Sequence, residues 1–456
     1  MQDSGDISTL LRVLMEQNEF LHQENANLKA RVSYLEKKLH RYEHPKNSSN
    51  SSKPPSQDPF RPKRTESLRE KSDKQPGGQK GHRGSCLEFS DQPDEVIEHR
   101  SDYCSVCGED LSSAETVFAG KRQVIDIPPI VPRIVEHRIY SRQCSCGHCQ
   151  VSDYPAEAHS SVCYGHNLLG LTAYLHSRQY LPFERMREMY RDVFGLEISS
   201  GSLVNMVQRF ASKVSGLYEI IRARIAQSPV VGGDETGVCI GGKNRWGWTF
   251  QTPKATFIVI DDSRGKKVID KHFNTGFPAA TLVHDCWKSY FKVAAQSHQI
   301  CTAHLLRELK YLGQLYKDEW STKFTRLLND ALQLKKELSP SDYLQPVEQR
   351  KRLEQRLDEL LNLPLDPKYE KLITFQIRII EYRQYLFRFL YQYDVPPDNN
   401  ASERAVRTFK VKQKISGLFR SFDGAQAFAI IRSVIDTTIK NHQNVWWALR
   451  YLVAAE

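Results

Sequence analysis

Residues 229–304 contain five short apolar runs whose order strongly restricts how this part of the chain can fold. The runs are PVVGGDETG, NRWGWTFQ, ATFIVID, ATLVHD and HQICTAH. We expect helices around Lys266–Phe273, after the third run, and around Trp287–Ala295, after the fourth. Three consecutive strands followed by a strand–helix–strand unit predict a mixed α/β sheet.

Three acidic residues on separate elements are candidates for one catalytic metal site. Asp234 directly follows PVVGG and Asp285 directly follows ATLVH, so we expect both at strand ends, while Glu403 lies near the start of a helix. Converging carboxylates can hold two divalent cations that activate a water or a 3′-hydroxyl for phosphodiester displacement. Oxygen ligands suit Mg²⁺, with Mn²⁺ as its substitute. Other acids compete for these roles, or all of them could be solvated: Glu235, Asp261, Asp262 and Asp398.

Five of the ten cysteines are spaced as in a zinc site. Cys104 and Cys107 form a CxxC pair, and after 36 further residues the sequence QCSCGHC supplies Cys144, Cys146 and Cys149. Two thiol pairs, each near a glycine, provide the four-thiolate tetrahedron that Zn²⁺ prefers. We favour Cys104, Cys107, Cys144 and Cys146 as ligands of one structural Zn²⁺, with Cys149 as the substitute. A redox pair or an inert set of cysteines are the alternatives.

Residues 8–43 are predicted to form a coiled coil. Leu14, Leu21, Leu28 and Leu35 recur every seven residues, which places Asn18 and Asn25 at the a positions of the heptad. Leucine at d with asparagine at a is typical of a parallel two-stranded coiled coil, so we expect a homodimer or a higher oligomer. The alternative is an amphipathic helix that docks on its own domain.

Residues 44–86 are rich in Ser, Pro, Gly and Lys, and are predicted to be a disordered basic linker. The whole chain carries 64 Lys and Arg against 54 Asp and Glu, a formal net charge of +10. Such an excess favours a polyanionic partner, most plausibly DNA. The chain has no apolar run of 18 residues and begins with a polar, acidic segment, so we expect no membrane span and no signal peptide.

Residues 87–162 carry β-branched runs interrupted by prolines, which predict a small β domain around the zinc site. Residues 163–228 are predicted to be helical. Two amphipathic segments, Glu184–Phe194 and Ser200–Ser212, flank the turn GLEISS, where Ser199 or Ser200 is a candidate N-cap. This pair of helices is a candidate helix-turn-helix for DNA binding.

Several motifs together resemble one family of mobile-element proteins. They are KNSSNSSKPPS, PGGQKGHRG, GGDETG, LVHDCWKSY, CTAHLLREL and DNNASERAVR. The sequence is similar, over nearly its whole length and in the same order, to the bacterial transposases of the insertion-sequence 66 family. The resemblance implies a ribonuclease-H-like catalytic domain with a DDE triad, which falls on Asp234, Asp285 and Glu403. The strand order read from the apolar runs agrees with that fold.

The resemblance completes the expected organisation of a multidomain α+β and α/β chain. The interval of 118 residues between Asp285 and Glu403 exceeds what a compact domain needs, so a helical insertion is expected before the last acid. The domains that we expect after the β domain are a helical region at 163–228, a catalytic core at 229–304 and 395–436, an insertion at 305–394 and a C-terminal helix at 437–456.

Basic residues beside the acids are candidates for DNA contacts. Arg404, Arg407 and Lys410 follow Glu403, and the last two share its helix face, so they could grip phosphates. His304, in AHLLREL, could orient a scissile phosphate or a metal-bound water. The alternatives are a solvated basic face and a packed strand-end histidine. Trp246 and Trp248 point the same way along one strand, and we expect core packing.

The sequence therefore predicts a cytoplasmic bacterial transposase that works at the nucleoid, with two Mg²⁺ ions and one Zn²⁺. It would cleave the ends of its own element and join them to target DNA, and accessory transposition proteins could take part. One alternative is a nuclease of the same fold without strand transfer. Another is a non-catalytic, zinc-containing dimeric regulator that binds DNA, against which the presence of all three acids argues.

Overall fold

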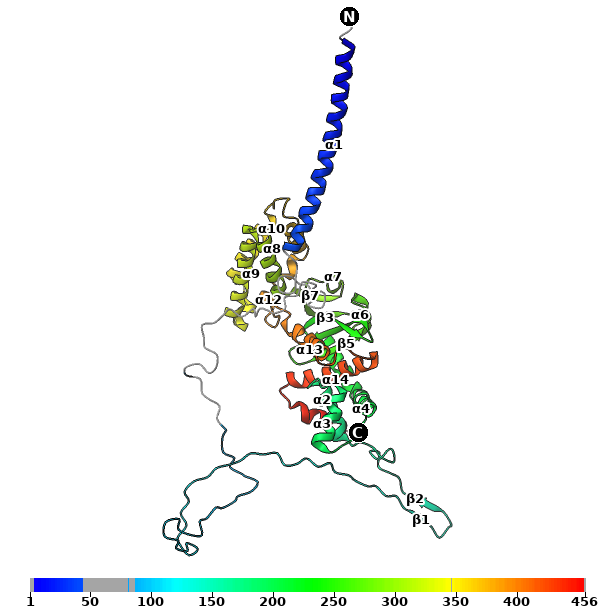
Figure 1. Cartoon of the computed structure of the whole chain (residues 1–456), viewed down its shortest axis with the longest axis vertical. Coiled ribbons are helices and arrows are strands. Elements are labelled where there is room, and N and C mark those ends of the chain that lie inside the picture. The colour runs from blue at the N-terminus through cyan, green and yellow to red at the C-terminus, as the bar shows by residue number, and fades with distance from the viewer. Residues whose placement is uncertain (1–3, 44–80, 82–86, 346, 455–456) are drawn as a thin grey trace.

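The computed structural model describes residues 4–43, 81, 87–345 and 347–454. The N-terminal element is one uninterrupted helix, α1 (Ser4–Glu43), over the predicted coiled-coil range (Figure 1). Its heptad residues Leu21, Leu28 and Leu35 are all more than half exposed, at 53–54%. The helix is confirmed, and its coiled-coil partner stays a prediction. The predicted linker at 44–86 lies outside the described residues, apart from Gly81.

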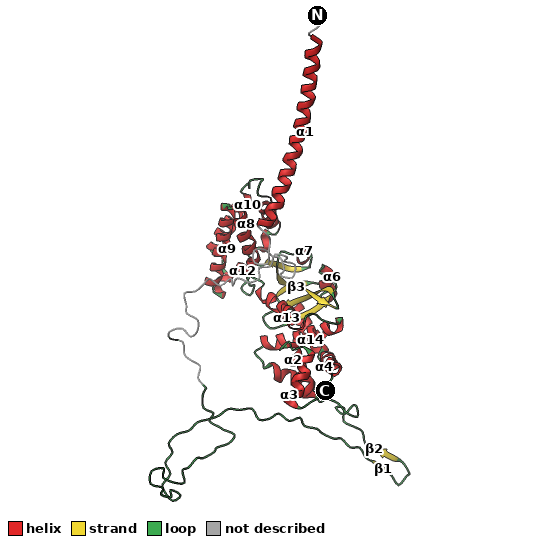
Figure 2. Ribbon diagram, viewed as in Figure 1, coloured by secondary structure: helices red, strands yellow, loops and turns green. Residues whose placement is uncertain are grey.

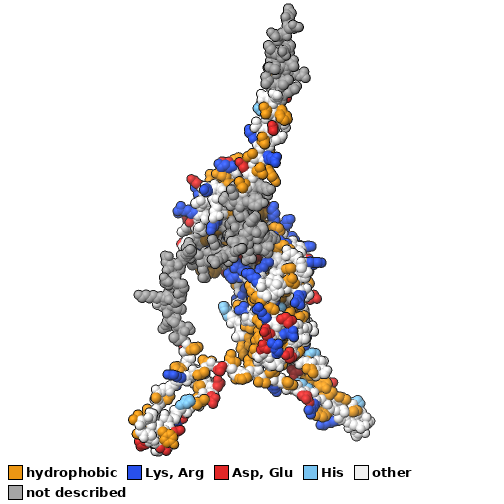
Figure 3. All heavy atoms as spheres, in the orientation of Figure 1, with side chains coloured by type: hydrophobic (Ala, Val, Ile, Leu, Met, Phe, Trp, Pro, Cys, Tyr) orange, Lys and Arg blue, Asp and Glu red, His pale blue; other side chains and the backbone are white. Residues whose placement is uncertain are grey.

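The segment at 87–162 differs from the β domain that its sequence predicts. Its only regular elements are two short antiparallel strands, β1 (Ser141–Gln143) and β2 (Cys149–Val151), and residues 117–140 run without a ladder (Figure 2). The prediction of strands at 124–139 was therefore wrong. The three prolines in this stretch have no N–H to donate, and its β-branched side chains face solvent, with Val124 93% exposed. The segment forms two extended arms, one to each side of the molecule in Figure 3, and hydrophobic side chains lie on the surface of both.

The region after this segment is helical, as predicted. It contains α2 (His166–Ser177), α3 (Phe183–Phe194), α4 (Ser200–Lys213) and α5 (Ser215–Ala226). Gly195 ends α3 with a φ of +65°, a left-handed conformation that glycine adopts without a steric cost. The Ser199 hydroxyl accepts a hydrogen bond from the Ser202 N–H at 3.0 Å, so Ser199 is the N-cap of α4.

A five-stranded mixed sheet forms the centre of the molecule. Its strands are β3 (Val230–Ile240), β4 (Lys243–Gln251), β5 (Thr256–Asp261), β6 (Phe277–His284) and β7 (Ala295–Ile300). The order is β5-β4-β3-β6-β7; the first three strands are antiparallel, and β3, β6 and β7 run parallel. The mixed sheet and all five predicted strands are confirmed, with the short helices α6 (Lys266–His272) and α7 (Lys288–Phe291) where helices were expected.

Asp234 and His304 lie in other places than the sequence predicted, because β3 and β7 end at other residues than expected. β3 continues to Ile240, so Asp234 lies within this strand and not at its end. β7 ends at Ile300 and Cys301 is the N-cap of α8 (Thr302–Tyr316), so His304 lies in the first turn of a helix.

Helices pack on both faces of the sheet. α13 (Asn400–Ser416) packs on β3 and β4, and α14 (Phe422–Lys440) packs on β5 and α4. Val238 and Ile240 of β3 join Phe409 of α13 in one buried cluster, whereas Trp248 and Phe250 of β4 face a larger core shared with α2–α5. Trp248 is fully buried and Trp246 packs against the same core, as predicted.

A block of helices lies between β7 and α13 in the sequence, where the insertion was predicted. It consists of α8, α9 (Glu319–Glu337), α10 (Glu348–Asn362), α11 (Glu370–Glu381) and α12 (Arg388–Tyr391), with 3₁₀ turns at Pro340–Leu344 and Arg383–Tyr385. These helices share a leucine- and phenylalanine-rich core with Val230 of β3, Val283 of β6 and Ile300 of β7. The last helix, α15 (Val445–Ala454), packs on α2. In the part of the chain that is described, no helix is long and apolar enough to span a membrane.

Candidate active site

The parallel pairing of β3 with β6 places two of the predicted acids beside each other. Gly232 of β3 pairs with Val283 of β6. Asp234 follows Gly232 by two residues and Asp285 follows Val283 by two residues, so the two acids lie at the same level of the sheet. Because side chains alternate along a strand, Asp234 lies on the same face as Gly232 and Val238, which is the face covered by α13.

The third acid comes from α13, and two close approaches fix this helix on the sheet. Asn399, which precedes α13, donates from Nδ2 to the Gly233 carbonyl at 2.6 Å. A Cβ atom on Gly247 of β4 would lie 2.5 Å from Cε2 of Phe409, so only glycine leaves room for that ring. These contacts hold the first turn of α13, which carries Glu403, against the strand that carries Asp234.

The three acids share one electrostatic environment. Burial raises the pKa of Asp234 well above its usual range, and the charges of Glu235, Asp285 and Glu403 raise it further. Burial also raises the pKa of Asp285 to about 7, with Glu235 and Glu403 adding to the shift. Like charges close together in a partly buried site raise each other's pKa, and a bound cation would relieve this repulsion.

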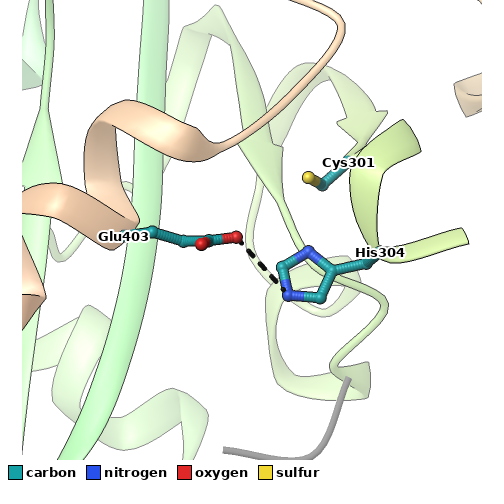
Figure 4. Close-up of side chains that lie close together, drawn as sticks. All are labelled: Cys301, His304 and Glu403. Carbon is teal, nitrogen blue, oxygen red and sulfur yellow. Dashed lines mark ion pairs between the residues drawn. The ribbon is translucent and has the colours of Figure 1, made fainter. Parts of the chain in front are cut away.

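Glu403 is only 14% exposed and is held by cationic partners on two helices. Its Oε1 lies 3.2 Å from Nη2 of Arg307 and 3.6 Å from Nε2 of His304, and its Oε2 lies 3.3 Å from Nη2 of Arg407. Figure 4 shows Glu403 pointing from α13 toward His304 of α8, with the Cys301 thiol beside the imidazole ring. Burial and the positive charge of Arg307 lower the pKa of His304 to about 3, so the imidazole is neutral.

The competing acids have other partners. Glu235, 1% exposed, binds Arg264 at 2.8 Å and accepts a hydrogen bond from the Tyr290 hydroxyl at 2.6 Å on the opposite face of β3. Asp398 accepts the Asn400 N–H at 3.0 Å before α13. Surface ion pairs occupy the two remaining acids, Asp261 with Lys271 and Asp262 with Arg245.

The predicted basic residues divide into two groups. Arg404 is exposed and the Arg407 side chain is 67% exposed, so both are accessible beside Glu403. Lys410 instead donates to the Gly237 carbonyl, and burial lowers its pKa. Arg307, which the sequence reasoning missed, contacts Glu403 directly. Its signal was present, since it follows His304 by three residues and so lies on the same helix face.

The predicted zinc ligands lie in two tight turns. The Gly108 N–H donates to the Cys104 carbonyl at 2.9 Å, and the Gly147 N–H donates to the Cys144 carbonyl at 2.9 Å. Hydrogen bonds, first from the Cys107 backbone, lower the pKa of Cys104, and those of Cys146 lower the pKa of Cys144. Thiols that ionise readily suit a zinc site.

The two cysteine pairs do not meet. Among the described residues, no three cysteines have sulfur atoms within 4.8 Å of one another. The hairpin β1–β2, whose connecting turn contains Cys144 and Cys146, lies in one arm of the 87–162 segment (Figure 1). The described residues at 87–162 are all exposed or half-buried, so this segment has no hydrophobic core of its own.

Two parts of the chain match models of known protein families: the region with the mixed sheet and the clustered acids, and the cysteine-rich segment. The model described as "Transposase IS66 family" matches residues 161–427. The model described as "zinc-finger binding domain of transposase IS66" matches residues 101–150, and that of a family of unknown function (DUF6444) matches residues 6–88. No curated protein sequence matches the chain. The chain belongs to the IS66 family of transposases, and the zinc-finger match supports a Zn²⁺ in this segment.

We predict that Asp285 by itself lowers the stability of the metal-free protein as pH rises from about 4 to about 7, while the buried neutral histidines act in the opposite direction. The raised pKa of Asp285 means that the folded chain holds a proton that the unfolded chain has already released over this range. Each pH unit between the two values costs about 1.4 kcal/mol. Urea unfolding of wild type and Asp285→Asn in EDTA at pH 5 and pH 8 isolates this contribution, because the histidines act alike in both proteins. The difference in stability between the two proteins should change by roughly 3 kcal/mol between the two pH values.

The matched control is Asp262→Asn, which changes an exposed acid and should keep the wild-type pH dependence. Asp285→Asn should lack the contribution of Asp285 and should therefore gain stability relative to wild type between pH 5 and pH 8. Mg²⁺ should stabilise wild type more at pH 8 than at pH 5. Equal pH dependence in wild type and Asp285→Asn would contradict the prediction.

Proposed function

We propose that this chain is a DDE transposase that cleaves DNA at the ends of its own element and joins the freed 3′-hydroxyl to target DNA. The observation that supports it best is the convergence of Asp234 within β3, Asp285 directly after β6 and Glu403 of α13 on the face of the sheet that α13 covers. Membership of a transposase family agrees with this chemistry.

The proposed catalytic domain is ribonuclease-H-like. Three antiparallel strands followed by two parallel ones, in the order β5-β4-β3-β6-β7, support this assignment. α8–α12 would then be an insertion between the second and the third acid. The insertion shares its core with β3, β6 and β7, so it packs against the parallel part of the sheet.

Two divalent cations, Mg²⁺ or Mn²⁺, would supply the activation of water or 3′-hydroxyl and the stabilisation of the leaving oxygen. Asp234, Asp285 and Glu403 would hold them through carboxylate oxygens, which are hard ligands. The raised pKa values of Asp234 and Asp285, and the repulsion that Glu403 adds to both, favour occupation by cations. For Glu403 this requires the carboxylate to exchange its contact with Arg307 or Arg407.

The arginines beside Glu403 would position the DNA backbone. The exposed Arg404 and Arg407 can reach phosphate oxygens with charge-assisted hydrogen bonds. His304, neutral and largely buried, would orient the carboxylate or a bound water. We place Lys410 last among the proposed DNA contacts because the Gly237 carbonyl already occupies its ammonium group. The helix pair α3–α4 stays a candidate for reading DNA sequence.

The triad is tested with conservative variants. Asp234→Asn, Asp285→Asn and Glu403→Gln keep side-chain shape but remove a negative charge from the cation site. Each should lower cleavage of DNA that carries the element's ends by about a thousandfold or more, because metal-assisted displacement has no other path here. Binding to those ends, measured by gel shift, should survive.

Controls separate this role from folding. Asp262→Asn should retain most activity. Asp234→Asn/Asp285→Asn should be little worse than either single variant, since groups that act as a unit are not additive. Near-wild-type cleavage by Glu403→Gln together with an inactive Asp398→Asn would show that Asp398 is the third acid. Cleavage without joining would favour the alternative nuclease, and binding without cleavage by the wild type would favour the regulator.

We also propose that one Zn²⁺ joins the two arms of the 87–162 segment through Cys104, Cys107, Cys144 and Cys146. Cys146→Ser should release zinc, measured by elemental analysis of reduced protein, whereas Cys149→Ser should keep about one Zn²⁺ per chain. Metal loss should also weaken end-specific binding while the sheet stays folded. The opposite result for the two serine variants would make Cys149 the fourth ligand.

The exposed heptad leucines support a coiled coil between copies of α1. Deletion of residues 1–43 should reduce the oligomer, measured by light scattering, and should weaken cleavage that needs two ends held together. Leu28→Lys in the full chain should act in the same direction, whereas Glu19→Lys, at the outward-facing b position, should not. An unchanged mass after deletion would contradict the coil.

We place the protein in the bacterial cytoplasm, at its DNA substrate, with accessory proteins as further partners.

A further inference from the structure

A compact cluster of metal-ligand groups lies on the side of Glu403 that faces α8. The Cys301 sulfur, a ring nitrogen of His304 and a carboxylate oxygen of Glu403 all lie within 4.8 Å of one another (Figure 4). Among the described residues this is the one group of three or more His, Cys, Asp or Glu gathered so tightly, and Asp234 and Asp285 do not belong to it.

The donor set differs in kind from the proposed Mg²⁺ site. A thiol and an imidazole are soft and borderline ligands that favour Zn²⁺ and related transition metals over Mg²⁺. Three protein ligands with an open fourth position are a common arrangement for Zn²⁺. The same carboxylate could therefore serve two metals of different chemistry, but not both at once.

The local structure holds these ligands in place. Cys301 is fully buried at the start of α8, and its sulfur accepts the Asn399 N–H at 3.2 Å. His304 lies three residues after Cys301, in the first turn of α8, so the two side chains lie on the same side of the start of the helix. Nδ1 of His304 is buried and has no hydrogen-bond partner, which is costly unless a ligand satisfies it.

We propose that Cys301, His304 and Glu403 form a binding site for Zn²⁺ or a similar transition-metal ion, and that its occupation withdraws Glu403 from the catalytic acids. Arg307 now holds the oxygen that would enter this site, so the ion would displace that contact. The inhibitory consequence rests on the proposed function, whereas the binding site itself does not.

Binding is tested on the full-length protein without DNA. Zn²⁺ titration against a chromophoric chelator should show one equivalent more for wild type than for Cys301→Ser, in addition to the metal of the cysteine-rich segment. His304→Gln, which keeps the thiol, should lose the same equivalent. Each loss should weaken binding at this site by more than about tenfold, because even indirect metal-site substitutions reach that size. Cys239→Ser, a partly buried cysteine of β3, is the matched control and should keep the site.

Co²⁺ gives a direct reading of the ligand. Its thiolate charge-transfer absorption should decrease in Cys301→Ser and stay unchanged in Cys239→Ser. Thermal unfolding without metal establishes that each variant is folded; if Cys301→Ser is not, His304→Gln decides alone. Equal Zn²⁺ stoichiometry and affinity in wild type and the folded variants would overturn the site.

Inhibition is measured separately, as the cleavage rate in Mg²⁺ with added Zn²⁺ divided by the same variant's rate without it. Wild type should fall about tenfold and Cys239→Ser should follow it, while Cys301→Ser should change much less. A wild type that binds the extra Zn²⁺ but never cleaves DNA would refute the proposed function and leave the site standing. Cleavage that Zn²⁺ inhibits equally in wild type and Cys301→Ser would refute the inhibitory role.

Discussion

The close approach of α13 to the central sheet is the constraint on which the candidate site depends. Gly247 lets the Phe409 ring lie against β4, and Asn399 ties the start of the helix to the backbone of β3. Glu403 comes 118 residues after Asp285 in the sequence, so tertiary contacts such as these have to bring it to the strand acids. A side chain at Gly247 would push the helix outward and would separate the third carboxylate from the other two.

Glu403 is where two different electrostatic environments meet. On the sheet side, burial and mutual repulsion raise the pKa of Asp234 and Asp285, which favours a hard divalent cation. On the α8 side, Arg307 neutralises the same carboxylate next to a thiol and a neutral imidazole. One side chain can therefore be directed toward catalysis or away from it. The cysteine-rich segment differs from this site, because its described residues form no buried core and its proposed zinc site would supply the stability that a core supplies elsewhere.

Much of the fold follows from local patterns that the sequence displays. The five apolar runs became five strands, the GLEISS turn became a helix boundary with Ser199 as its cap, and the leucine repeat became one long helix. Asp285 was placed correctly because a strand end is a local event. The β-branched residues and prolines at 124–139 led to a wrong prediction of strands. A strand also needs a partner strand, and no strand among the described residues pairs with this stretch.

The sequence by itself determined the element types and the identity of the acids, because hydrophobic period and turn chemistry act within a few residues. Only the tertiary structure decided which neighbours each side chain meets. It placed Asp234 within β3 facing α13, moved His304 into a helix beside Glu403, and turned Lys410 onto the Gly237 carbonyl. Such contacts join residues far apart in the chain, and their geometry follows from packing between elements, which no local pattern encodes.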